Sequence, residues 1–101
     1  MNFTFNEFLD ATTYCIKVEK NPEIIHRRWF LRKLREYIAD FISEREFNDY
    51  EDIDNFLNSI DKTGAFDILE ESKEELMQTV KSYGDINKGL DWLWEIFGIN
   101  A

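Results

Sequence analysis

The sequence contains few of the residues that cross-link or interrupt a chain. Its 101 residues include one cysteine, one proline and four glycines. A single cysteine cannot form an internal disulfide, so we expect a protein of a reducing compartment, the cytoplasm. A small β-sandwich or β-barrel needs more turn residues than this chain contains. The scarcity of these residues therefore argues against a disulfide-rich domain and against an all-β domain.

Long apolar runs and positive charges are scarce as well. No run approaches the roughly 18 apolar residues of a membrane span, and the N-terminus lacks the basic and apolar blocks of a secretory signal. Lys and Arg number 12 against 21 Asp and Glu, which gives a formal net charge of −9. Because phosphate binding needs a cationic face, we expect neither direct nucleic-acid binding nor a membrane partner.

No side-chain pattern in the sequence indicates catalysis, a metal or a cofactor. There is no glycine-rich phosphate loop, and one histidine with one cysteine cannot supply the clustered ligands of a zinc site. An EF-hand loop counted from Asp49 would need glycine at its sixth position and glutamate at its twelfth, where the chain has Asp54 and Ile60. We therefore expect that the protein is not an enzyme and holds no metal and no cofactor.

Amphipathic patterns predict a single all-α domain over residues 1–101. The hydrophobic fraction of 44% is typical of a globular fold. The capping signals are Thr4 with Glu7, Asn21 with Pro22, and Asn48 with Glu51. Together with apolar residues at three- and four-residue steps, they predict helices over 5–18, 22–44 and 49–61, one or two helices over 65–83, and a last helix over 86–98. Residues 12–18 are rich in β-formers, so a short strand there is the alternative. We expect a compact bundle of four to five amphipathic helices.

Charge is unevenly distributed along the chain. Residues 20–35 contain six bases and one acid, whereas residues 36–101 contain five bases and seventeen acids. The bases of the first segment either pair with acids of later helices or form a site for an anionic ligand or partner.

An aromatic residue accompanies these bases. On a helical wheel Trp29 lies outside the apolar stripe, and an exposed Trp flanked by Arg is typical of a binding hot spot, although this face could equally seat another helix of the domain. In the last helix, Trp92 projects away from the inward face. The alternative partner-binding candidates are therefore Ile25, Trp29, Arg32, Lys33 and Trp92.

The densest acidic stretch joins the second and third predicted helices. Acids at a helix start are favourable, but close carboxylates repel one another, so helix capping explains only part of the series. An acidic surface with an aromatic residue suits docking on a cationic cleft, and a solvated acidic face is the alternative. We call this stretch the acidic segment, and its candidate partner-binding residues are Glu46, Asp49, Tyr50, Glu51, Asp52 and Asp54.

These features predict a small acidic protein-binding module. In bulk character alone it is similar to immunity proteins that neutralise nuclease toxins and to phage-encoded inhibitors that mimic DNA charge. We expect it to occlude a cationic or nucleic-acid-binding site of a toxin nuclease or defence protein, in a phage or toxin–antitoxin context. One alternative is an anionic-ligand or nucleic-acid binder acting through the basic helix 22–35. Another is a structural subunit of a homo-oligomer, of which a homodimer is the simplest case.

Overall fold

The computed structural model describes residues 3–18 and 24–98, and this part of the chain forms six helices and no strand. In chain order they are α1 (Phe5–Val18), α2 (Ile24–Glu44), α3 (Tyr50–Asp61), α4 (Ala65–Leu69), α5 (Lys73–Ser82) and α6 (Ile86–Gly98). The predicted all-α class is confirmed, with one helix more than the four to five expected. The segment 12–18 continues α1 and does not form the alternative strand.

The start of α1 is held by the capping box that the sequence predicts. The backbone N–H of Glu7 donates to Thr4 Oγ1 at 3.1 Å, and the backbone N–H of Thr4 donates to Glu7 Oε1 at 3.0 Å. This exchange satisfies two of the donors that a helix start leaves without partners. The corresponding signals for α2, Asn21 and Pro22, lie outside the described residues.

The starts of α3 and α5 are also capped by side chains. Asp49 accepts from the backbone N–H of Asp52 at 2.9 Å, so the cap predicted at Asn48 is wrong by one residue. Ser72 accepts from the backbone N–H of Glu75 at 3.4 Å. The apolar pattern over 65–83 therefore forms two helices, α4 and α5, with a new start at Ser72.

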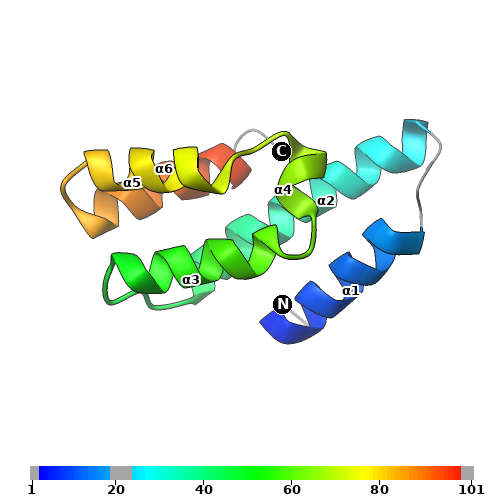
Figure 1. The fold of residues 1–101 in the computed structure, drawn as a ribbon, viewed down its shortest axis with the longest axis horizontal. Helices are drawn as coiled ribbons and strands as arrows, with labels where there is room; N and C mark the ends of the chain where they lie inside the picture. The colour runs from blue at the N-terminus through cyan, green and yellow to red at the C-terminus, as the bar shows by residue number, and fades with distance from the viewer. Residues whose placement is uncertain (1–2, 19–23, 99–101) are drawn as a thin grey trace.

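The long helix α2 is the central element of the fold (Figure 1). Helix α6 packs along α2, α5 and α6 form an antiparallel pair, and α3 packs against α5 and α4. The molecule is elongated, with extents of 41 × 23 × 21 Å. The largest fully buried side chains are Phe56, Phe66, Phe97, Ile38, Ile53, Leu57, Ile60, Leu93 and Val80.

Helix α1 is attached to α2 and α3 by a cluster of aromatic rings. Phe5 stacks on Phe56 with ring centres 5.1 Å apart, and Phe5 and Phe8 lie 5.2 and 5.3 Å from Phe41. The guanidinium of Arg45 lies 4.7 Å from the Phe5 ring centre, within cation–π distance. Much of the 16% aromatic content of the chain therefore holds α1 in place.

The turn between α4 and α5 depends on an unusual backbone conformation. Glu70 ends α4 with φ 59° and ψ 40°, in the left-handed region that disfavours residues with a Cβ. Arg35 of α2 donates to the carbonyl of Leu69 at 3.2 Å and lies 3.5 Å from the carboxylate of Glu71. A cation at a helix C-terminus satisfies free carbonyls and favours the helix dipole, so Arg35 stabilises this turn from outside.

Candidate partner-binding surfaces

Two neighbouring acids of the acidic segment stabilise the start of α3. The carboxylate of Asp49 accepts from the N–H of Asp52, and the carboxylate of Asp52 accepts from the N–H of Asn48, both at 2.9 Å. Backbone amides thereby hold both carboxylates in fixed positions at the positive end of the helix dipole. Their presence in the sequence is explained by the fold alone.

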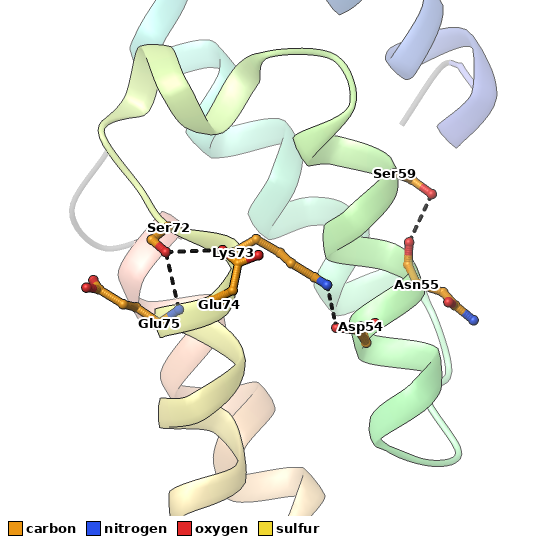
Figure 2. A network of polar contacts seen from close by, with 7 residues as sticks. All are labelled: Asp54, Asn55, Ser59, Ser72, Lys73, Glu74 and Glu75. Atoms are coloured by element: carbon orange, nitrogen blue, oxygen red, sulfur yellow. Dashed lines mark hydrogen bonds and ion pairs between the residues drawn. The ribbon is translucent and has the colours of Figure 1, made fainter.

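A third acid of the segment, Asp54, links α3 to α5. Its carboxylate lies 2.8 Å from the Nζ of Lys73, the first residue of α5 (Figure 2). This hydrogen bond from the charged ammonium group raises the pKa of Lys73 above its ordinary value of 10.5. The resulting stabilisation is present below pH 10.5 and is lost as the pH rises through the raised pKa. Asp54 is therefore already occupied by an internal cation.

The unoccupied part of the acidic segment is smaller than the sequence suggests. The side chains of Glu46 and Glu51 are exposed and make no hydrogen bond or ion pair with any residue in 3–18 or 24–98. Tyr50 and Phe47 are half-buried against the core, and the Phe47 ring meets Phe56 at 5.3 Å. The surface available to a partner consists of two free carboxylates, two capping carboxylates and the exposed edges of two rings.

The basic start of α2 is only partly paired with acids. Lys33 lies 3.3 Å from Glu36 on its own helix, and Arg35 lies 3.5 Å from Glu71. The bases that are exposed and form no ion pair within the described chain are Arg27, Arg28 and Arg32. Of the two interpretations of this segment, internal pairing holds for Lys33 and Arg35, and the three arginines remain available.

Trp29 lies 55% exposed beside these arginines, at the edge of an apolar groove between α1 and α2. The groove has a volume of about 190 Å³. Its α1 side includes Phe8, Ala11, Thr12 and Cys15, and its α2 side includes Trp29, Phe30, Lys33 and Tyr37. The structure thus brings together Trp29 and Lys33 and places Arg32 one helical turn from Trp29, while the side chain of Ile25 lies outside the described part.

The aromatic residues of α6 differ from expectation in their exposure. Trp92 is half-buried, because it lies on the side of α6 next to α5, where its ring is 6.5 Å from that of Tyr83. Trp94, on which no prediction was based, is 39% exposed. The two residues are two positions apart and so lie on different sides of α6, and Trp94 lines a hollow together with Ile42 and Ser43 of α2. Trp92 is not brought near Trp29 by any contact within the described residues.

The two surfaces lie at opposite ends of α2. At 1.5 Å per residue, the stretch of α2 from Arg28 to Glu44 is about 24 Å long, and the acidic segment follows Glu44. A small ligand therefore cannot contact both, and each surface can be tested by itself.

Within the described residues, neither metal-ligand geometry nor helix length adds a further candidate site, and comparison with known proteins adds none. The described residues contain no group of three or more His, Cys, Asp and Glu side chains placed to hold a metal ion. None of the described helices has the length and apolarity needed to cross a membrane. No family model, curated protein or solved structure matches this chain significantly. A function must therefore be argued from the two surfaces.

Proposed function

We propose that the protein is a non-catalytic protein-binding module that covers a cationic or nucleic-acid-binding site of a partner with its acidic segment. The observation that supports this most directly is the pair Glu46 and Glu51, which are exposed and have no part in capping or ion pairing within the described chain. Residues 44–54 contain six acids and one base, so the surface around this pair is strongly negative.

The fixed acids of the segment support the same proposal. Backbone amides hold the carboxylates of Asp49 and Asp52, so they lose little conformational freedom when a partner binds. Negative charge steers a cationic partner into contact, and the half-buried rings of Phe47 and Tyr50 add apolar contact area. The mechanism is occlusion, as expected of an inhibitor or an immunity protein in the cytoplasm of a cell that carries the partner.

The first test removes the two free charges. The assay uses a basic protein isolated by affinity capture on the wild-type chain from its native host. We expect Glu46→Gln with Glu51→Gln to lower the association rate with this protein several-fold, and to do so more at low than at high ionic strength. The matched control is Asp40→Asn with Asp67→Asn, which removes two exposed acids elsewhere. Association rates measured by surface plasmon resonance should be close to wild type for the control.

The rival surface is tested in the same assay. Trp29→Ala with Arg32→Ala should leave binding of the basic partner unchanged if the acidic segment is the contact. Loss of binding in this variant, with a native circular dichroism spectrum and unchanged binding by the Glu46 and Glu51 variant, would contradict the proposal and assign the function to the start of α2.

A further inference from the structure

A hollow with aromatic walls lies on the surface where α5 meets α6. It is lined by Tyr83, Lys88, Asp91, Trp92 and Glu95, and it has a volume of about 230 Å³. Tyr83 follows the last residue of α5, and the other four lining residues belong to α6. Pockets for drug-sized ligands measure about 300–1,000 Å³, so this smaller hollow has room for a group the size of one side chain. We call it the Tyr83–Trp92 hollow.

The short turn between α5 and α6 holds the two rings of the hollow next to each other. Gly84 makes the turn with a positive φ of 69°, and Asp85 caps the start of α6 by accepting from two backbone N–H groups. The ring centres of Tyr83 and Trp92 lie 6.5 Å apart, with their planes inclined by 39°. Tyr83 is 45% exposed, so the pair presents an accessible aromatic surface that is already ordered before a ligand binds.

These two rings have no cation of the described chain over them. Elsewhere in the fold, Arg35 lies over the ring of Phe97, and Arg45 lies over two other phenylalanines. The face of an aromatic ring attracts a cation, and the indole of Trp does so most strongly. The cation–π capacity that the core uses twice is therefore unused at Tyr83 and Trp92.

The charged residues of the hollow indicate the sign and the shape of a ligand. Asp91 and Glu95 are four residues apart on α6, so they are neighbours on one side of the helix. The carboxylate of Asp91 is exposed and forms no ion pair within the described residues. Lys88 is the one base among the lining residues. A matching ligand is a cation that lies flat on an aromatic ring and donates to two carboxylates at once, and a guanidinium group does both.

We propose that the Tyr83–Trp92 hollow binds an arginine side chain of a partner protein, with the guanidinium stacked on the two rings and hydrogen-bonded to Asp91 and Glu95. Arginine is favoured over lysine because its guanidinium is planar and more weakly hydrated than an ammonium group. The turn between α5 and α6 lies at the same end of the molecule as the start of α3 (Figure 1), so the acidic segment adds negative potential at this end. The hollow contains no residue of the acidic segment, so this site does not depend on the function proposed above.

The test compares three short peptides that differ in one side chain. Each has blocked ends and a central residue between two glycines, and this residue is arginine, lysine or citrulline, which has nearly the shape of arginine without its charge. Binding to the full chain is followed by NMR through the indole N–H signal of Trp92, assigned with a Trp92→Phe variant. We expect a saturable shift with the arginine peptide, at least threefold weaker binding of the lysine peptide, and no saturable shift with the citrulline peptide.

Variants of the hollow should change the affinity for the arginine peptide in both directions. Tyr83→Ala removes an exposed ring and Asp91→Asn removes one charge at constant shape, and each should weaken binding at least threefold. Lys88→Gln removes the base that repels the ligand and should strengthen binding about twofold, which a general loss of stability does not produce. Trp94→Ala removes an exposed Trp of α6 that lies outside the hollow, and it should leave the affinity unchanged.

A further control separates this site from the acidic segment. Glu46→Gln with Glu51→Gln removes two exposed charges outside the hollow, so it should leave the affinity for the arginine peptide within twofold of wild type. The same variant is the one that slows association in the assay of the proposed function. The two proposals can therefore fail independently of each other.

Three results would overturn the proposal. One is equal binding of the arginine and citrulline peptides, or no saturable shift with either, since the hollow would then not recognise a cation. A second is loss of binding in Trp94→Ala with full binding in Tyr83→Ala, which would move the site to the hollow that Trp94 shares with α2. The third is equal weakening by Asp91→Asn and by the Glu46 and Glu51 variant, since the peptide would then respond only to the net charge of the chain.

Discussion

Gly89 shows how the absence of a side chain fixes the distance between two helices. It is buried in α6, and a Cβ placed on it would lie 2.8 Å from the carbonyl oxygen of Val80 in α5. Because that oxygen belongs to the backbone, it cannot move away by rotating a side chain. The close packing of α5 on α6 therefore requires glycine at this position.

We expect Gly89→Ala to destabilise the protein by up to about 2 kcal/mol. Alanine gains about 1 kcal/mol of helix propensity over glycine, but overpacking a tight contact costs about 1–3 kcal/mol and forces α5 and α6 apart. Urea unfolding measures the difference. Asn87→Ala, at an exposed site of the same helix, should change stability by less than about 0.5 kcal/mol. If Gly89→Ala made the protein more stable, α5 and α6 would be able to move apart at no cost in the free energy of unfolding.

The capping box of α1 predicts a local pH dependence. Backbone and side-chain hydrogen bonds from Thr4 lower the pKa of Glu7 below its ordinary value of 4.5. A carboxyl with a lowered pKa stabilises the fold above its unfolded pKa, and this stabilisation is lost as the pH falls through the lowered value. Carboxyl NMR titration should find the Glu7 pKa low in wild type and raised towards, but still below, 4.5 in Thr4→Ala, because this change removes the hydroxyl and keeps the backbone N–H of residue 4. An unchanged pKa in Thr4→Ala would contradict the capping role.

At the scale of the helices, the sequence predicts most boundaries and leaves open one break, between α4 and α5. The ranges 5–18 and 86–98 are those of α1 and α6, because caps and apolar spacing are local signals. Nothing local indicates that Glu70 adopts a left-handed conformation. Its cost is offset by Arg35, which is distant in sequence, so the end of α4 could be inferred only from the folded chain.

The candidate surfaces also combine features that the local sequence predicts with features that depend on packing between helices. The wheel of α2 places Trp29 outside the apolar stripe, and its exposure confirms this. The sequence does not reveal that Asp54 is occupied by Lys73, or that Trp92 lies against Tyr83, because both contacts join different helices. The groove depends on the spacing between α1 and α2, which is a property of their packing and has no local signal.

Helix α1 should be the first helix to open. Among the side chains of residues 5–17, those of Phe8 and Thr12 are buried, whereas α3 buries Ile53, Phe56, Leu57 and Ile60. Few buried contacts and a groove along one side mean a low free energy of local opening. Hydrogen exchange followed by mass spectrometry should find amides of α1 exchanging at least tenfold faster than those of α3. Equal protection would mean that α1 opens only with the whole molecule.

On the scale of the whole molecule, the fold places the basic and the acidic segments of the sequence at opposite ends of helix α2. The free arginines stand near the start of α2, and the acidic segment follows its end, in a molecule 41 Å long. The sequence shows the two charge blocks but not their separation, since a different path of α3 and α5 could have placed acids beside Arg28 and Arg32. Among the described bases of residues 20–35, only Lys33 and Arg35 have acid partners.

This polarity has a consequence for self-association. In a two-fold dimer, residue i of one copy contacts residue j of its partner, and residue j contacts residue i. Two copies laid side by side and antiparallel along α2 would therefore set the arginines of each against the acidic segment of the other, and both kinds of end would be covered in one closed pair. Charge-driven assembly of this chain would favour such an antiparallel dimer over an open filament, while the net charge of −9 opposes its first step.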